Sequence, residues 1–373
     1  MRIAILGRDF PPAIGGIGDH SDRLATELAA RAHHVTVICS PPGEQRAMFD
    51  VRPVVRGWDA RGLSSITAAV AAAEPDVIVW QYNPSSVGRK GLAPSAGRLA
   101  RALASHAPLV VLAHELWFPW GREGLKGMLW AVAHRAQMRA IVRAASRVIV
   151  TTERRADELS ETIRRARAKT SVVPIGSNIE PSEGSSSVRA EMGIPDDAFV
   201  VAHFGSVGPG RELGPLLAAV RTLRAQGHDV HVLLVGKTGP FEAPSDLGVA
   251  VHATGLTDRE QLSVALASAD AYLHPDLTGP AAGRRGSLMA AFALGLPVVA
   301  YRGPDHARQL VDGSNILLVE PSGDEVARAL RTLQDEPDIA KGIGAEAERT
   351  YARWFSWTHV ADGVLQAIQE ATR

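Results

Sequence analysis

Three segments of the 373-residue chain place glycines, and in two cases arginines, directly before a predicted helix. They hold Gly15 and Gly16 in the first segment, Gly205, Gly210 and Arg211 in the second, and Arg284, Arg285, Gly286 and Ser287 in the third. Glycine lets a ligand approach the backbone closely, and the amides of a helix N-terminus attract negative charge. Arginines at a helix N-terminus oppose the helix dipole unless an anion is bound between them. The segments predict binding of a phosphate-bearing ligand, with tight turns and solvated arginines as the alternative interpretation.

Several motifs of other phosphate-binding and catalytic proteins are absent from the sequence. The first glycine loop is no dinucleotide fingerprint, because Ser21 stands where the third glycine belongs. Residues 236–238 resemble the end of a Walker A loop, but His231 replaces its first glycine. No G-x-S-x-G elbow or D-x-D triplet occurs, and the single cysteine, Cys39, excludes a disulfide framework and a cysteine-ligated zinc. We therefore expect neither a resident cofactor nor a metal.

Short, almost wholly apolar runs alternate with helix-period segments, as in parallel sheets covered by helices on both faces. The expected strands are residues 2–7, 34–39, 76–82, 108–115, 147–152 and 170–175, then 199–205, 229–236, 249–255, 271–275, 297–301 and 316–320. The expected helices of the first half are residues 18–31, 63–73, 94–106, 124–145 and 154–167. Residues 176–195 break the pattern and predict a linker, with a short helix at 188–192, between two doubly wound α/β domains. Such domains bind ligands beyond the carboxyl ends of their strands.

The composition is that of a globular protein. Lys and Arg number 40 against 40 Asp and Glu, and 46% of the residues are hydrophobic, which argues against intrinsic disorder and against nucleic acid as a partner. No stretch is apolar enough to span a bilayer, and the start lacks the apolar core of a signal peptide, so we expect a cytoplasmic protein. The charges are unevenly distributed, because residues 1–181 hold 24 basic and 16 acidic side chains and residues 182–373 hold 16 and 24.

Taken together, these features resemble the glycosyltransferase family 4 enzymes, which are retaining sugar-nucleotide transferases of the GT-B fold. The matching segments are Gly15-Gly16, Ala113-His114-Glu115, residues 173–178, Phe204-Gly205, Gly255-Leu256-Thr257, Ala269-Asp270, Leu273-His274-Pro275, and residues 293–300 and 354–357. The resemblance implies two Rossmann-like domains that face each other across a cleft. Residues 1–180 would bind the acceptor and residues 181–354 the nucleotide sugar, and a helix at 355–373 would cross back onto the first domain.

The resemblance also implies roles for single residues. His114 matches a residue that contacts the donor sugar, and Glu115 and Asn178 are placed on the acceptor side. Arg211 keeps one of two cations that neutralise the donor diphosphate, and the Gly15-Gly16 loop closes over the phosphates. The implied reaction is metal-independent transfer of a sugar from a nucleoside diphosphate sugar to a glycan, a lipid-linked saccharide or a small acceptor. A strand-end histidine with its hydrogen bonds satisfied is the alternative interpretation of His114.

The chain departs from the family pattern at the donor site. The usual Glu-x7-Glu pair aligns with Ala282 and Ala290, and Gly208 replaces the second phosphate-binding cation. Arg284, Arg285 and Ser287 resemble a less common arginine-rich branch, and we infer that they take over phosphate binding. The missing carboxylates leave two other hypotheses open: a GT-B protein that binds or scaffolds without catalysis, and a sugar-nucleotide epimerase, for which no acid and base carboxylates can be placed.

Residues 116–147 form a further candidate surface. The segment contains four large aromatic side chains and four regularly spaced arginines: Trp117, Phe118, Trp120, Trp130, Arg135, Arg139, Arg143 and Arg147. Its six basic residues face a single acid, Glu123. Tryptophans at the interface and arginines at the headgroups could hold the protein on the inner face of an anionic membrane. A helix with a solvated arginine face and buried aromatic rings is the alternative.

Overall fold

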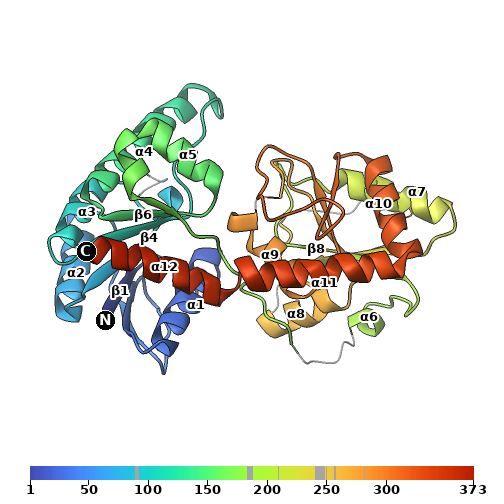
Figure 1. The fold of residues 1–373 in the computed structure, drawn as a ribbon, viewed down its shortest axis with the longest axis horizontal. Helices are drawn as coiled ribbons and strands as arrows, with labels where there is room; N and C mark the ends of the chain where they lie inside the picture. Colours follow the sequence, from blue (N-terminus) through green and yellow to red (C-terminus); the bar gives the residue numbers. More distant parts are fainter. Residues whose placement is uncertain are drawn as a thin grey trace. The chain divides into compact units, whose positions relative to one another are not determined.

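The computed structural model describes residues 1–88, 92–182, 188–208, 210–239, 248, 250–255, 258–280 and 282–373. Residues 183–187 of the predicted linker lie outside the described residues, and so do residues 256–257 of the segment Gly255-Leu256-Thr257. The chain forms two compact units, one of Met1–Ile175 with Trp357–Arg373 and one of Gly176–Ser356 (Figure 1). The division lies close to the predicted boundaries at residues 181 and 355, and it places Asn178 in the second unit.

The first unit is built on a parallel sheet of seven strands in the order β3-β2-β1-β4-β5-β6-β7. Its elements are β1 (Arg2–Leu6), α1 (Gly16–Ala30), β2 (His34–Cys39), β3 (Asp50–Pro53), α2 (Ala60–Ala73), β4 (Val77–Tyr82), η1 (Pro84–Ser86), α3 (Ala96–Ala104), β5 (Leu109–Ala113), α4 (Gly124–Ala144), β6 (Arg147–Val150), α5 (Glu153–Thr162), η2 (Arg164–Lys169), β7 (Thr170–Val172) and α12 (Trp357–Thr372). β3 was not predicted from the sequence. It is a four-residue edge strand that ends in a proline, which an edge tolerates because it has one unpaired side.

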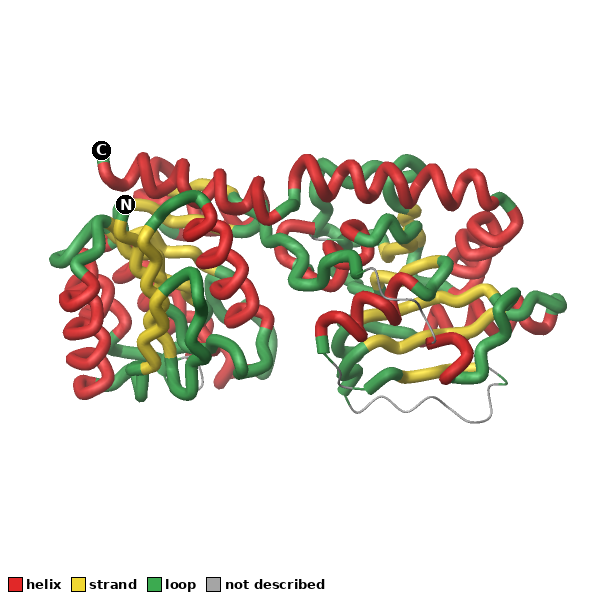
Figure 2. Tube along the Cα trace, turned by 90° about the horizontal axis from the view of Figure 1, so that it is seen from below, coloured by secondary structure: helices red, strands yellow, loops and turns green. Residues whose placement is uncertain are grey.

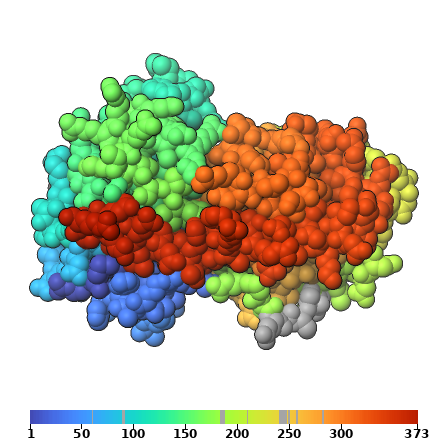
Figure 3. Space-filling view, viewed as in Figure 1, coloured from blue at the N-terminus to red at the C-terminus, as the bar shows by residue number. Residues whose placement is uncertain are grey.

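Alternate residues of each strand in the first unit enter opposite cores, as the two-residue period of a strand requires. Ala4 and Leu6 of β1 face a core formed with α2, α3 and α4, whereas Ile3 and Ile5 face a core formed with α1 and α12. The last helix therefore completes one face of a sheet built by the start of the chain, and its outer side lies on the surface of that unit (Figure 3).

The second unit repeats the architecture with six parallel strands in the order β10-β9-β8-β11-β12-β13. Its elements are α6 (Val188–Glu191), β8 (Phe199–Phe204), α7 (Gly214–Ala225), β9 (Val230–Val235), β10 (Ala250–Ala253), α8 (Arg259–Ala267), β11 (Ala271–His274), η3 (Ala282–Arg284), α9 (Gly286–Ala293), β12 (Val298–Tyr301), β13 (Leu317–Val319), α10 (Gly323–Asp335) and α11 (Pro337–Trp354). Helices α7 and α10 cover one face of the sheet, and α8, α9 and α11 cover the other. Figure 2 shows the strands in yellow with helices in red on both sides.

The strand order of both sheets reverses at a defined place, between β1 and β4 in the first unit and between β8 and β11 in the second. At such a switch point the loops after the two strands turn to opposite faces, which opens a crevice at the carboxyl edge. Among the helices of the described residues, none has the length and hydropathy needed to cross a bilayer.

The packing of α12 predicts a test of the first unit. Ile368 is fully buried, and its replacement by alanine should lower the free energy of unfolding by about 2–4 kcal/mol through lost burial and a residual cavity. The neighbouring exposed Gln369→Ala is the control and should change it by less than about 0.5 kcal/mol. Equal effects of the two variants in denaturant titrations would show that α12 does not belong to this core.

Candidate functional site

Two of the arginines that the sequence singles out in the second unit, Arg211 and Arg285, lie beside a buried carboxylate, Asp276, in the loop that follows β11. Its side chain is 2% exposed, and Arg285 forms an ion pair with it. The Nε atom of Arg211 lies 3.9 Å from the same carboxylate oxygen, Oδ2. The amide and hydroxyl of Thr278 donate to the other oxygen, Oδ1, at 3.0 and 2.7 Å. Burial alone would raise the pKa of Asp276, but the Thr278 hydrogen bond and the charge of Arg285 lower it below its usual value. The carboxylate is therefore charged and holds two cations in place.

Backbone pairing brings these residues together from two loops at the switch point of the second sheet. Arg211 and Asp276 form an antiparallel bridge, and the amide of Leu277 donates to the carbonyl of Gly210 at 2.9 Å. Gly205 and Gly210 have φ angles of 108° and 84°, which are strained for other residues, so the fold itself requires glycine there.

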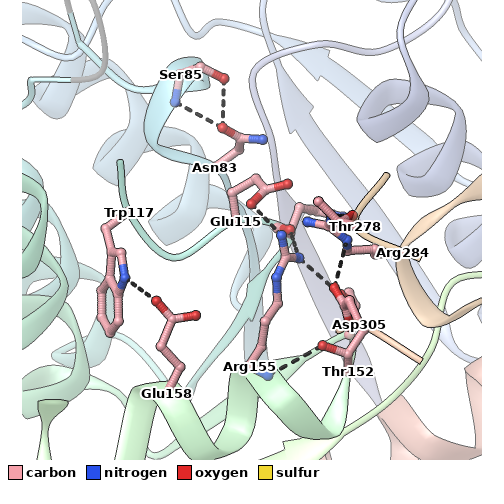
Figure 4. Close-up of polar contacts among 12 residues, drawn as sticks. Asn83, Ser85, Glu115, Trp117, Thr152, Arg155, Glu158, Thr278, Arg284 and Asp305 are labelled. Carbon is pink, nitrogen blue, oxygen red and sulfur yellow. Dashed lines mark hydrogen bonds and ion pairs between the residues drawn. The ribbon is translucent and has the colours of Figure 1, made fainter. Parts of the chain in front are cut away.

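Arg284 is held by a second carboxylate on the same edge. Its Nε atom lies 3.4 Å from Oδ2 of Asp305, and its Nη2 atom lies 3.4 Å from the hydroxyl of Thr278. The amide of Asp305 donates to the carbonyl of Thr278 at 2.8 Å. Figure 4 shows Arg284 directed toward Thr278 and Asp305. Each of the three predicted cations thus has a carboxylate that restricts its position.

Helix α9 begins beside these arginines without a side-chain cap. Arg285 is its N-cap residue, and the Arg285 side chain accepts no hydrogen bond from the first turn. A Cβ atom added to Gly286 would meet no described atom within 4 Å, and Gly286 is not among the glycines with a positive φ angle. Packing and backbone geometry therefore do not require glycine at this position. A helix N-terminus that is open in this way attracts an anion. Ser287, in the first turn, forms a side-chain hydrogen bond with Tyr272, whose pKa burial raises to about 12.

Two histidines lie in the central strands below this edge. Burial lowers the pKa of His203 to about 4 and that of His274 to about 3, so both are neutral near pH 7. His203 forms a ring hydrogen bond to the carbonyl of Leu273, whereas neither ring nitrogen of His274 finds a partner in the described part of the chain. Neutral imidazoles place polar atoms beside the arginines without adding repulsion.

In the first unit, His114 follows β5 and is held by its neighbours. Its Nε2 atom lies 2.6 Å from Oε1 of Gln81, its ring packs edge-on against His20, and Arg155 donates to its carbonyl. Burial, followed by the charges around it, lowers the pKa of His114 well below its usual value. The arrangement is compatible with both interpretations of this histidine, a satisfied structural group and a neutral contact for a sugar hydroxyl.

Glu115, predicted on the acceptor side, forms an ion pair with Arg155 of α5, whose side chain is 7% exposed. Figure 4 shows the two side chains directed toward each other. Gly15 and Gly16 start α1, which has no side-chain cap, and a Cβ atom at either would meet no described atom within 4 Å. The N-terminus of α1 thus has the same open geometry as that of α9. Asn178 lies half-buried in the segment that follows β7.

The interpretation of residues 116–147 as one arginine face with interfacial tryptophans is wrong in part. Arg135 is buried, its guanidinium lies 4.7 and 4.3 Å from the ring centres of Trp117 and Trp120, and it donates to the carbonyls of Phe118 and Ala131. Trp117 is buried and donates to Glu158 at 2.6 Å, as Figure 4 shows. Arg147 lies in β6 and pairs with Glu370.

The structure gathers the predicted residues of each unit at the carboxyl edge of that unit's sheet, with Asn178 in the segment that follows β7. Asp276, Asp305, His203, Gln81 and Arg155 were not predicted. Asp276 and Gln81 follow or end strands at the switch points, which is a signal that sequence reasoning could have used. Within the described residues, no group of three or more His, Cys, Asp or Glu is placed to hold a metal ion.

Comparisons with known proteins agree with this architecture. Residues 15–176 match a family model described as a glycosyl transferase 4-like domain, and residues 198–336 match glycosyl transferases group 1. The chain is 30% identical over 252 residues to a D-inositol 3-phosphate glycosyltransferase of Streptomyces avermitilis, covering 62% of this chain and 53% of the relative. It is 26% identical over 402 residues to an alpha-maltose-1-phosphate synthase of Mycolicibacterium smegmatis, covering 100% of both. A sucrose-phosphate synthase structure from Thermosynechococcus elongatus aligns over 99% of this chain and 98% of its own, with a TM-score of 0.74 and 19% identity.

Two doubly wound units of this kind define the GT-B class of proteins. Within that class, the chain belongs to glycosyltransferase family 4. The predicted family and the predicted pair of α/β units are confirmed. The match to the first curated relatives spans about half of their length.

The Asp276 network predicts a large effect of removing one charge. Asp276→Asn keeps an oxygen for Thr278 but leaves Arg285 and Arg211 without their counter-charge, so unfolding free energy should fall by about 2–4 kcal/mol. The exposed Asp312, which pairs with Arg302 in the same unit, provides the control, and Asp312→Asn should cost less than about 1 kcal/mol.

The same variant has a predicted pH dependence. Because folding lowers the pKa of Asp276, its contribution is present at neutral pH and is lost as the pH falls through the folded value. The difference between wild type and Asp276→Asn should therefore shrink below about pH 4. A difference in denaturation midpoints that is constant down to pH 2 would contradict the assignment of this ion pair.

Proposed function

We propose that the protein is a retaining glycosyltransferase that moves a sugar from a nucleoside diphosphate sugar to an acceptor hydroxyl. The observation that carries this proposal is the open N-terminus of α9, which is flanked by Arg284 and Arg285. The carboxylates of Asp305 and Asp276 hold these two arginines in position. Family membership supports the same reaction class. The diphosphate of the donor is the anion for which this arrangement is suited.

In the proposed reaction, the acceptor oxygen bonds to the anomeric carbon while the bond from that carbon to the β-phosphate oxygen breaks. The nucleoside diphosphate leaves with the electron pair, and the hydroxyl proton passes to the departing phosphate. Negative charge therefore grows at the phosphate, which we place beside Arg211, Arg285 and the first amides of α9. Preorganised donors of this kind stabilise a transition state because they need little rearrangement as the charge develops. We propose that this replaces a divalent cation.

The absence of the two family carboxylates is consistent with this arrangement. Ala290 is fully buried in the core of the second unit, where a glutamate could not be accommodated without a charge partner. Asp276 supplies a carboxylate at the same edge from a different position. The alternative, a GT-B protein that binds or scaffolds without catalysis, is favoured by the absence of both carboxylates, at Ala282 and Ala290, and it predicts ligand binding without turnover.

Binding of nucleoside diphosphates tests the proposed donor site. We expect UDP, GDP or ADP to bind in titration calorimetry, and Arg284→Ala with Arg285→Ala to weaken that binding about 10–100-fold through the loss of charge-assisted hydrogen bonds. Arg302→Ala, at an exposed position of the same unit, should leave it unchanged, and so should a chelator. Binding by none of the three nucleotides would refute the donor-site assignment. Binding without any hydrolysis or transfer of the matching donor would favour the scaffold.

We further propose that α4 holds the protein at an anionic membrane, where a lipid-linked acceptor would be found. Leu125, Met128, Leu129 and Val132 follow the i, i+3, i+4, i+7 spacing of one helix face and are 75%, 49%, 65% and 55% exposed. Arg139 and Arg143 continue the same exposed stripe in the last turns of the helix. Apolar residues followed by cations suit an anionic lipid surface better than a neutral partner protein.

Flotation with vesicles tests the membrane proposal. Wild type should float with vesicles of phosphatidylglycerol at low salt and much less with phosphatidylcholine. Leu125→Ser with Leu129→Ser should reduce the floating fraction severalfold. The control variant, Val311→Ser with Ile339→Ser, removes two exposed apolar side chains of the second unit and should leave the floating fraction unchanged. Equal flotation of both double variants would refute the proposal that α4 contacts the membrane.

A further inference from the structure

Two histidines that the proposed reaction does not use lie close together on neighbouring strands of the second sheet. His231 is the second residue of β9, and His252 is the third residue of β10, the edge strand. In the parallel register of the two strands, Ala250 lies opposite His231 and His252 lies opposite Leu233. Opposite residues, and every second residue along a strand, share one face of a sheet. Both imidazoles therefore lie on the same face as Leu233.

A hydrogen bond joins the two rings. Nδ1 of His231 lies 2.9 Å from Nε2 of His252, and the rings are nearly parallel, with an interplanar angle of 18° and centroids 5.2 Å apart. On its other side, Nε2 of His231 lies 3.1 Å from Oδ1 of Asp229, which Arg224 contacts at 2.9 Å. A carboxylate only accepts hydrogen bonds, so the hydrogen of a neutral His231 is on Nε2. Its Nδ1 therefore has a lone pair that is directed at His252.

Proteins prepare a histidine for a metal ion in the same way. A histidine that binds a metal usually donates its second ring N–H to a carboxylate, which fixes the tautomer and the orientation of the ring. His231 is 7% exposed and is held by packing, whereas His252 is half-buried at the edge strand and keeps access to solvent. Leu233 and Val235, the next residues of β9 on this face, are fully buried and apolar. Packing of this face therefore does not require imidazoles.

A zinc ion needs little more room than the hydrogen bond that it replaces. Two nitrogens with zinc–nitrogen bonds of about 2.0–2.1 Å and a tetrahedral angle lie about 3.3 Å apart, against 2.9 Å between the two ring nitrogens here. The half-buried ring of His252 turns so that the two lone pairs converge on the ion. The hydrogen on its Nε2 passes through solvent to its Nδ1, so both ligands stay neutral.

We propose that His231 and His252 bind one divalent transition-metal ion, such as Zn²⁺, with Asp229 as the outer partner of His231 and water in the remaining coordination positions. Imidazole nitrogens favour zinc, copper and nickel, whereas magnesium and calcium prefer oxygen ligands. A bound ion joins the edge strand β10 to β9 in addition to the backbone hydrogen bonds that pair them. The inference goes beyond the proposed transferase function and does not rest on it.

Zinc titration of the full chain, without an affinity tag and freed of metal by a chelator, tests the site. In calorimetry at neutral pH we expect about one Zn²⁺ to bind per chain and Mg²⁺ not to bind. Asp229→Asn keeps both ligands and removes the outer carboxylate, so it should weaken zinc binding about tenfold. His252→Gln removes a ligand and should weaken zinc binding more than Asp229→Asn does.

Two further measurements identify the ligands and the strand that the ion holds. The electron paramagnetic resonance spectrum of the Cu²⁺-loaded wild type should show coupling to two imidazole nitrogens, and that of His252→Gln to at most one. In hydrogen exchange, zinc should slow the amides of residues 250–253 in wild type and leave them unchanged in His252→Gln, because the ion binds only when both strands are in place.

His228→Gln is the matched control, because it removes a half-buried imidazole from the loop just before β9. His33 offers another place for a metal ion, since its Nδ1 lies 3.5 Å from the N-terminal amine, and His33→Gln is therefore a second control. Both controls should bind zinc like wild type. The proposal is overturned if wild type binds no zinc, if His252→Gln binds it as tightly as wild type, or if a control loses as much affinity as His252→Gln.

Discussion

The carboxylate of Asp276 lies at the end of β11, where Arg285 and Arg211 balance its charge and Thr278 donates two hydrogen bonds to it. Its exposed fraction is 2%, so it could not persist there as an anion without these partners. The two arginines depend on Asp276 in turn, because its carboxylate holds each guanidinium near one position. This mutual dependence holds two loops of the second unit together at one edge of the sheet. An anion that arrives at the edge meets cations that have already lost most of their conformational freedom.

The two sheets share an arrangement that favours the binding of an anion. Parallel strands bring their carboxyl ends to one edge, and the following helices direct their N-terminal amides toward that edge. The starts of α1, α3 and α9 have no side-chain cap. At Gly16 and Gly286 neither packing nor a positive φ angle calls for glycine. Stability therefore does not explain glycine at these two positions, whereas close approach of a ligand to the backbone would explain it.

Most of the fold follows from local sequence features, because buried parallel strands are short apolar runs that stand out between helices. Residues 50–53 escaped this rule because an edge strand that contains Asp, Arg and Pro has little apolar signal. The arginines of the proposed donor site could be named from their glycine-flanked loops. Their partners could not, because Asp276 is 65 residues from Arg211 and only the order of the strands brings them together. Arg135 was misread for a related reason: helical spacing placed it on the arginine face, while two tryptophans from the preceding loop cover it.

A crystal structure of the protein with a bound nucleoside diphosphate tests the central claim most directly. The account predicts that the phosphates lie at the N-terminus of α9, within about 3 Å of its first amides and of Arg285 or Arg211, with Asp276 still in contact with at least one arginine. A diphosphate bound elsewhere, with Arg284 and Arg285 turned toward solvent, would contradict it.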